Sequence, residues 1–331
     1  MELGIKKSVA ILLSVYNGGH FLEAQLKSLI SQRYDDWILV WRDDGSSDES
    51  RTIMRSFSDN VGAGRCLELQ DDRGRLGAAA SFHRLLQWTQ SYPFVAFCDQ
   101  DDVWLPNKLT RAMDRVTAID QTVPILYCSR QMIVDKSLAF QRLSSIPGKV
   151  REFPSSLLRN IATGCTVVLN RSAARLVAGS SPASAFVHDW WSYIVVSAVN
   201  GHIIYDETPM ILYRQHGTNT IGATPSVLVR MKAALGRGLG YYLALLYDQS
   251  SALLSSGLPL SVDTCEILYN IRTAIEGGRF CRLKLFCNRS FRRDSWWENA
   301  LLALWMVAGS ARKNTVMLGV TSGSQSPKNR S

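Results

Sequence analysis

Residues 94–104 read FVAFCDQDDVW, a short apolar run followed at once by three aspartates within four positions. A run of this length, rich in aromatic and aliphatic side chains, is typical of a strand buried on both faces of a parallel sheet. Similar runs occur at 8–15, 37–42, 66–69 and 125–128, and amphipathic segments lie between them at 21–32, 50–57 and 76–90. This alternation predicts an α/β layer with a mostly parallel central sheet flanked by helices.

The second half of the chain has a looser pattern. It predicts a long loop over 133–154, strands at 165–169, 202–206 and 210–213, and a helix at 185–200. After residue 222 it predicts three helices, at 225–254, 262–276 and 294–306, without strand alternation. We therefore expect a domain of residues 1–221, a basic helical extension over 222–320, and a disordered tail over 321–331.

Composition excludes several classes of protein. The 331 residues are 46% hydrophobic, so most of the chain is not intrinsically disordered. The seven cysteines form no CxxC pair, which favours buried thiols in a reducing compartment over disulfides or a zinc site. No apolar run approaches the roughly 18 residues that a membrane span needs. These features predict a cytoplasmic protein.

The net charge of +9 is concentrated in one part of the chain. Residues 1–221 hold 23 Lys/Arg and 22 Asp/Glu, whereas residues 222–331 hold 14 and 6. Basic helices that also carry tryptophan and tyrosine favour peripheral contact with an anionic leaflet, here the inner face of the cell membrane. A solvated helical cap is the alternative. Nucleic acid is not expected as a partner, because no recognised binding module is present.

Three acidic clusters follow predicted strands or open a helix. They are Asp43–Asp48 (DDGSSD), Asp99–Asp102 (DQDD), and the pair His188 and Asp189. In open α/β sheets, ligands bind at the carboxyl ends of the strands. The crowded carboxylates of the second cluster repel one another unless a hard divalent cation or donor groups hold them. An ordinary turn with a helix cap remains the alternative for the first cluster, and a simple cap for Asp189.

Taken together, these motifs resemble a known family. Ser14-Val15-Tyr16-Asn17, then Asp43–Asp48, then Cys98–Trp104, at these separations, are similar to family 2 glycosyltransferases of the GT-A fold. The resemblance spans about residues 8–220 and is greatest to the rhamnosyltransferase-like bacterial polysaccharide branch. It implies inverting transfer of a sugar from a nucleoside diphosphate donor (dTDP-rhamnose or a UDP-hexose) to a polysaccharide or lipid-linked acceptor, assisted by Mn²⁺ or Mg²⁺.

The same resemblance implies roles for individual residues. It places the nucleotide sugar against Ser14, Tyr16, Asp43, Asp44, Arg75, Asp99 and Arg214, and the metal ion on Asp99, Asp101 and His216. It assigns Gly164, Trp190 and Trp191 to the acceptor side, with packing in the core as the alternative for one of the two tryptophans. It makes Asp189 the base that takes the proton of the attacking hydroxyl, since a single displacement needs a carboxylate within hydrogen-bond reach.

Two features depart from the wider family pattern. A Gln-x-x-Arg-Trp motif is absent, and Arg214-Gln215-His216 stands near that region; Ser81 occupies a position where asparagine was expected. The basic charge concentrated after residue 221 keeps a second class of function open. A non-catalytic protein could use the basic helices to bind an anionic membrane or nucleic acid, and it would show no metal-dependent nucleotide affinity.

Overall fold

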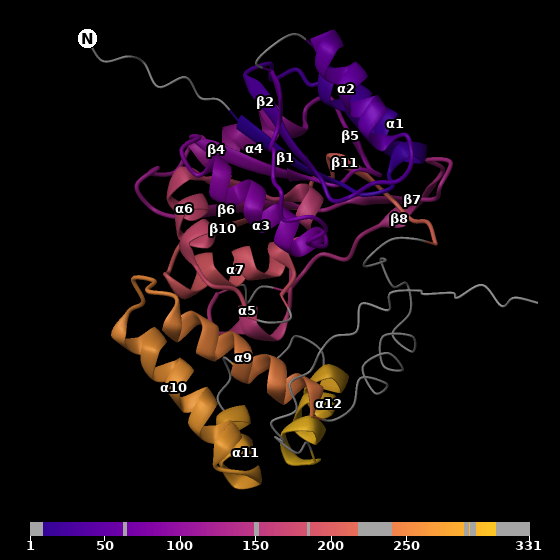
Figure 1. Cartoon of the computed structure of the whole chain (residues 1–331). Coiled ribbons are helices and arrows are strands. Elements are labelled where there is room, and N and C mark those ends of the chain that lie inside the picture. The colour runs from indigo at the N-terminus through magenta and orange to yellow at the C-terminus, as the bar shows by residue number, and fades with distance from the viewer. Residues whose placement is uncertain are drawn as a thin grey trace, which may run out of the picture.

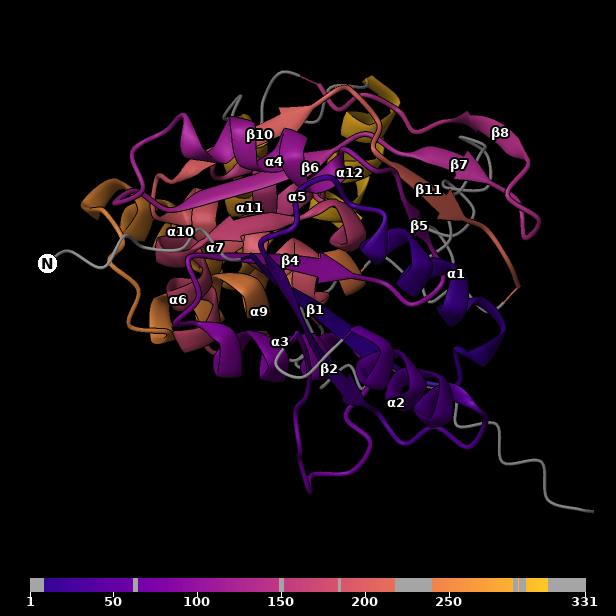
Figure 2. The same cartoon turned by 90° about the horizontal axis from the view of Figure 1, so that it is seen from above.

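The computed structural model describes residues 9–61, 65–148, 152–183, 186–217, 240–287, 291 and 296–308. Its main feature is a seven-stranded sheet in the order β10-β6-β9-β4-β1-β2-β3 (Figures 1 and 2). The strands are β1 (Val9–Val15), β2 (Trp37–Asp43), β3 (Cys66–Glu68), β4 (Phe94–Cys98), β6 (Ile125–Ser129), β9 (Val168–Asn170) and β10 (His202–Asp206). β4, β1, β2 and β3 are parallel, and β9 runs antiparallel between β4 and β6. The predicted α/β layer is confirmed.

Helices bury both faces of this sheet. Successive side chains of a strand point to opposite faces, and β1 is apolar on both: Ile11 and Leu13 face one core, Ala10 and Leu12 the other. One face is covered by α1 (Gly19–Ile30), α2 (Ser50–Val61) and α4 (Lys108–Thr117). The other is covered by α3 (Ala78–Thr89), α6 (Arg171–Gly179) and α7 (His188–Ala198). This double burial explains the continuous apolar runs in the sequence.

A second, four-stranded sheet begins directly after residues 99–102, the second acidic cluster. Its order is β5 (Val103–Trp104), β11 (Ile211–Arg214), β7 (Met132–Val134) and β8 (Phe140–Leu143). The prediction of a long loop over 133–154 is therefore wrong for the β7–β8 hairpin. β8 exposes most of its residues to solvent, so it lacks the apolar run that marks a strand in sequence. These short strands form because they pair with strands that are distant in the sequence, as β11 does with β5 and β7.

The segment between β8 and β9 contains two short turns of helix. They are α5 (Ser155–Leu158) and a 3-10 turn over Gly164–Thr166. The predicted strand at 165–169 is thus correct only from Val168 onward. The 3-10 turn replaces its first residues, and it places a backbone N–H next to the start of α7.

Four helices pack beyond α7, on the side away from the sheet (Figure 1). They are α9 (Tyr241–Ser255), α10 (Val262–Glu276), α11 (Arg279–Cys287) and α12 (Trp296–Ala308). The Tyr242 hydroxyl donates to the Leu158 carbonyl at 2.7 Å, and Leu243 and Leu246 join the core beneath α7. α11 was not predicted, and residues 225–239, the boundary at 222 and the tail at 321–331 lie outside the described residues. In the described part of the chain, no helix has the length and apolar character to cross a membrane.

Candidate active site

The candidate site lies at the point where β1 and β4 separate. From β1 the chain continues to β2 and β3 on one side, and it returns to β4 on the other side. β1 and β4 pair only as far as Leu13 and Cys98. Loops that leave two such strands diverge and open a crevice, which is the usual ligand position in sheets of this type. The segments 14–19, 43–49 and 99–102 all leave the sheet at this edge.

The first acidic cluster builds a turn that joins two of these loops. Asp43 Oδ2 accepts hydrogen bonds from the N–H groups of Gly45 and Ser46, at 3.1 and 3.0 Å. Asn17, in the left-handed region at φ 45°, accepts from the Ser47 N–H at 2.8 Å. The first acidic cluster therefore does form a turn, which was the alternative interpretation of its sequence. Asp43 nevertheless keeps a second oxygen, Oδ1, that is buried and has no hydrogen-bond partner among the described residues.

Asp44 is fully engaged by protein donors. Its carboxylate accepts from the N–H groups of Leu76 and Gly77, each at 2.7 Å, and from the Arg42 guanidinium at 2.5 Å. Arg42 is 1% exposed and also lies 3.5 Å from the carboxylate of Asp71. Because a buried charge needs such partners, this network fixes the loop that carries Arg75.

Tyr16 and Arg75 form one wall of the crevice. The Arg75 guanidinium lies over the Tyr16 ring, 4.0 Å from its centroid. Ser14 donates its hydroxyl hydrogen to Ser81 Oγ at 2.8 Å, and Ser81 Oγ also accepts from Arg42 at 3.3 Å. The structure therefore brings Tyr16 and Arg75 together, and it bonds Ser14 to the buried serine that stands at position 81 in place of asparagine.

The second acidic cluster forms a loop, residues 99–102, that is fixed from β11. Asp102 Oδ1 accepts the Arg214 backbone N–H at 3.0 Å, and the Arg214 guanidinium donates to the carbonyl oxygens of Asp101 and Lys136 at 2.7 and 2.6 Å. Arg214 is only 4% exposed. The structure thus makes Arg214 a support for the acidic loop, in place of the phosphate-facing position predicted from sequence. Beside it, His216 Nε2 lies 2.8 Å from Asp101 Oδ2.

The carboxylates of this acidic loop repel one another. Burial and the charges of Asp101 and Asp189 raise the pKa of Asp99 to about 8. Burial and the charges of Asp101 and Asp99 also raise the pKa of Asp102, whose Oδ2 has no hydrogen-bond partner among the described residues. Asp189 is connected to this loop through the turn at residues 164–165, since the Gly164 N–H donates to Asp189 Oδ2 and Cys165 Sγ lies within 4.8 Å of carboxylate oxygens of Asp99 and Asp102.

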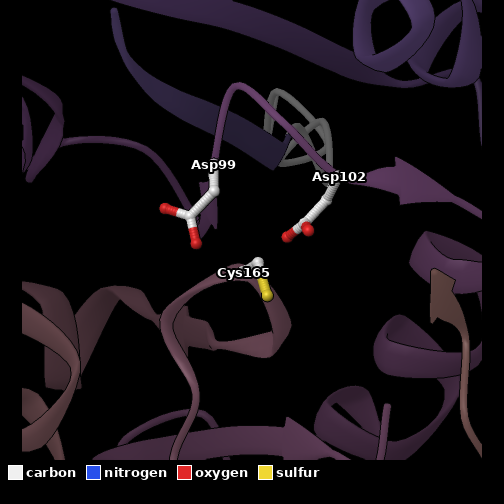
Figure 3. A group of neighbouring side chains, drawn as sticks. All are labelled: Asp99, Asp102 and Cys165. Carbon is white, nitrogen blue, oxygen red and sulfur yellow. The ribbon is translucent and has the colours of Figure 1, made fainter. Parts of the chain in front are cut away.

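The donor set fits a hard divalent cation. In Figure 3 the carboxylates of Asp99 and Asp102 lie opposite Cys165, and one ligand atom from each falls within 4.8 Å of the others. Burial raises the pKa of the Cys165 thiol, so it stays protonated. Mn²⁺ and Mg²⁺ prefer carboxylate oxygen, and Mn²⁺ also accepts imidazole. Asp101 offers a further carboxylate, 2.8 Å from His216 Nε2, but among the described residues Asp99 is grouped with Asp102 and Cys165 and not with this pair.

Asp189 sits in the first turn of α7, against the Gly164 turn. Its Oδ2 accepts the Gly164 N–H at 2.9 Å and its Oδ1 accepts the Trp190 N–H at 2.5 Å. Burial is the main reason that its pKa rises to about 6. Position 164 must be glycine, since a Cβ there would lie 2.7 Å from His188 Nε2. A fixed carboxylate with this pKa can act as a base near neutral pH.

The two tryptophans after Asp189 differ in surroundings. Trp191 is 2% exposed and donates its indole N–H to Ser180 Oγ at 2.8 Å, so it belongs to the core and does not offer a face to a sugar. Trp190 is half-buried and donates to the Ser156 carbonyl at 2.7 Å. His188, which the sequence analysis did not assign to the site, stacks on Phe82 with ring centroids 4.1 Å apart. Burial lowers the pKa of His188 to about 3, so it is neutral.

Comparison with known proteins identifies the family. The family described as glycosyl transferase family 2 matches residues 10–176, which is half of the chain and contains both acidic loops. The chain belongs to glycosyl transferase family 2. The expected enzyme class is thereby confirmed, and the enzyme is favoured over the non-catalytic alternative.

Two bacterial glycosyltransferases are similar to this chain. It is 26% identical to the dTDP-rhamnosyl transferase RfbG of Shigella flexneri over 235 residues, which cover 66% of this chain and 77% of that one. It is 31% identical over 165 residues to the UDP-Glc:alpha-D-GlcNAc-diphosphoundecaprenol beta-1,3-glucosyltransferase WfgD of Escherichia coli, covering 50% and 60% of the two chains. The chain therefore spans less than two thirds of that glucosyltransferase.

A solved structure confirms the fold. Residues 1–349 of TarS from S. aureus, crystallised in complex with UDP-GlcNAc, superimpose with a TM-score of 0.55 at 12% identity. The match covers 89% of this chain and 78% of that one. The architecture is GT-A, with additional C-terminal helices, as predicted.

Proposed function

We propose that this enzyme transfers a sugar from a pyrimidine nucleoside diphosphate to a saccharide or lipid-linked saccharide acceptor, with inversion at the anomeric carbon. One observation carries the proposal: the turn at residues 164–165 contacts both groups, because the Gly164 N–H donates to Asp189 Oδ2 at 2.9 Å and Cys165 Sγ lies within 4.8 Å of carboxylate oxygens of Asp99 and Asp102. A candidate base and a candidate metal site therefore lie on either side of one turn. Inverting transfer needs both, one beside the leaving diphosphate and one beside the attacking hydroxyl.

The donor nucleoside is assigned to the wall made by Tyr16, Arg75 and Asp43. Aromatic and guanidinium planes stack on bases, and the unpaired Oδ1 of Asp43 suits a ring N–H donor. Uracil and thymine carry such an N–H at N3. The two relatives are named as a dTDP-rhamnosyl transferase and a UDP-Glc-dependent glucosyltransferase, and these donors carry thymine and uracil. A UDP-hexose and dTDP-rhamnose are therefore the two leading donors.

The diphosphate is assigned to the acidic loop. Asp99, Asp101 and His216 would hold Mn²⁺ or Mg²⁺, which would neutralise the charge that develops on the leaving diphosphate. Arg214 keeps these ligands in place through the Asp101 carbonyl and the Asp102 carboxylate. Asp44 belongs to the same machinery indirectly, because it fixes the loop that carries Arg75.

The acceptor is assigned to the side of α7. Asp189 takes the proton of the acceptor hydroxyl as that oxygen attacks the anomeric carbon from the face opposite the diphosphate. The N–H groups of Gly164 and Trp190 orient the Asp189 carboxylate for this step. The half-buried indole of Trp190 is proposed to contact the acceptor sugar.

Peripheral membrane contact at the cytoplasmic face is proposed for the C-terminal helices. On α11, Phe280 is 89% and Leu283 42% exposed, and Arg279 and Lys284 beside them are exposed as well. Exposed apolar residues flanked by basic ones suit an anionic bilayer. A lipid-linked acceptor would be presented there. Nucleic acid is not proposed as a partner.

The function is tested with the full chain, Mn²⁺, and a panel of UDP-, dTDP- and GDP-sugars offered with lipid-linked and soluble saccharides. We expect transfer from a UDP- or dTDP-sugar, and an anomeric configuration in the product opposite to that of the donor by NMR. Retention of configuration would rule out single displacement by Asp189. Absence of binding to every nucleotide in the panel, with and without Mn²⁺, would reject the donor assignment.

A further inference from the structure

Gln100 lies between two proposed metal ligands, yet its side chain is bonded to a different loop. The Tyr16 N–H donates to Gln100 Oε1 at 2.9 Å, and Gln100 Nε2 donates to the Tyr16 carbonyl at 3.0 Å. The side-chain amide thus pairs with Tyr16 as a peptide group of a neighbouring strand would. It satisfies both backbone groups of the residue whose ring forms the proposed nucleoside wall.

This pairing occurs where the sheet itself stops. β1 and β4 are hydrogen-bonded up to Leu13 and Cys98, and β4 then turns away into the acidic loop. β1 remains paired with β2 through Val15. On the β4 side, the Gln100 amide continues the ladder to Tyr16 across the opening crevice, so it forms part of the floor between the two halves of the site.

Gly18 is shaped around the same amide. A Cβ at position 18 would lie 2.4 Å from Gln100 Cδ and Oε1 and 2.9 Å from Nε2. The backbone of Gly18, at φ −100° and ψ 3°, lies in the bridge region at negative φ, which residues other than glycine also occupy. Glycine is therefore required here by the Gln100 side chain and not by its own conformation.

We propose that Gln100 is a positioning residue that couples the nucleoside wall to the cation ligands, so that each ligand binds more tightly when the other is present. The inference rests on the proposed function, in which Tyr16 contacts the nucleoside and Asp99 and Asp101 hold the cation. A nucleoside orders Tyr16, a cation orders the residues on either side of Gln100, and the two hydrogen bonds make each ordering favour the other. Such coupling is reciprocal by thermodynamic necessity.

A nucleoside without phosphates distinguishes coupling through Gln100 from direct contact between a diphosphate and the cation. Uridine and thymidine cannot reach a cation held by the acidic loop through a diphosphate, so any effect on Mn²⁺ affinity passes through the protein. Free Mn²⁺ is measured by electron paramagnetic resonance in titrations of the full chain, with and without saturating uridine or thymidine. For the unmodified enzyme we expect the nucleoside to tighten Mn²⁺ binding by about five-fold or more, the lower end of typical couplings.

Variants of the clamp give the decisive comparison. In Gln100→Ala we expect the nucleoside effect on Mn²⁺ affinity to fall to about one-fold, that is, to no coupling. Gly18→Ala should produce the same loss, because the new methyl displaces the amide. The double variant should lose no more of the coupling between nucleoside and Mn²⁺ than Gln100→Ala alone, because the truncated side chain at position 100 leaves room for the methyl group at position 18. Gln90→Ala, at an exposed position after α3, is the control.

The outcomes separate the inference from the function beneath it. If the enzyme binds none of UDP, dTDP and Mn²⁺, the proposed function is wrong. If it binds both but the nucleoside leaves Mn²⁺ affinity unchanged, or if Gln100→Ala keeps the full coupling, the inference is wrong. A purely structural role is recognised by a lower melting temperature and weaker binding of both ligands with an unchanged coupling factor, which also overturns it.

Discussion

Asp189→Asn tests the assignment of the base most directly. Asp189 Oδ2 and Oδ1 each accept one backbone N–H, from Gly164 and Trp190. Asparagine has the same shape but offers one acceptor oxygen, so its amino group must face one of these N–H donors. Losing a hydrogen bond to a charged group costs about 1.5–3 kcal/mol locally. Loss of a general base costs a further factor of about 10²–10⁴ in kcat.

The pH dependence supplies a second, independent magnitude. With a pKa of about 6, Asp189 must lose its proton before it can accept one from the acceptor. kcat should therefore rise as pH rises through 6 and level off above 7, and at pH 5 about a tenth of the plateau rate should remain. Asp189→Asn should abolish this acidic limb and leave a low, flat profile.

The assay measures transfer between pH 5 and 8.5 with the donor and acceptor found in the panel, and nucleotide binding by calorimetry at each pH. Asp263→Asn is a matched control, because Asp263 is an exposed aspartate in the first turn of another helix, α10. We expect Asp189→Asn to bind donor nucleotide with affinity close to that of the unmodified enzyme. If it kept more than about a tenth of kcat, the loss would fall short of what a general base contributes and the assignment would be refuted.

Three further predictions concern the nucleotide, the cation and the core. Tyr16→Ala should weaken UDP or dTDP binding by about ten-fold with or without Mn²⁺, since a stacked ring contributes about 1–3 kcal/mol; calorimetry with an unchanged affinity would exclude stacking. Asp101→Ala should remove the Mn²⁺ dependence of nucleotide binding. If added Mn²⁺ still tightens nucleotide binding to this variant as it does in the unmodified enzyme, Asp101 is not a metal ligand. Asp206→Ala should lower the free energy of unfolding by about 1–3 kcal/mol, because Asp206 holds Arg111 at 2.6 and 2.8 Å. Burial alone would raise the pKa of Asp206, but hydrogen bonds led by that of Arg111 hold it below its usual value. The contribution of Asp206 to the free energy of unfolding should therefore be present above about pH 4 and be lost as the pH falls below 4. This prediction is contradicted if urea unfolding shows that the variant and the unmodified enzyme lose the same stability between about pH 7 and 3.

Most of the strands that the sequence did not predict are short. β5, β7 and β8 are two to four residues long, and no hydrophobic period can be read over so few positions. Arg214 shows the consequence. A cation after a strand was expected to face a phosphate, but the second sheet turns its guanidinium toward the carbonyls of Asp101 and Lys136. Trp191 was misassigned for a similar reason, since the sequence does not say which face of α7 is buried.

By itself, the sequence determined the alternating strands and helices, the family, and the loops that carry the acidic clusters. Those properties follow from local patterns, because a strand buried on both faces must be apolar throughout and a parallel sheet places its loops at one edge. The tertiary structure alone decided which side chains meet across those loops. Gln100 and Tyr16 are 84 residues apart, and Asp189 and Gly164 are 25 apart. Their hydrogen bonds exist only after the sheet has aligned segments that have no local interaction with each other.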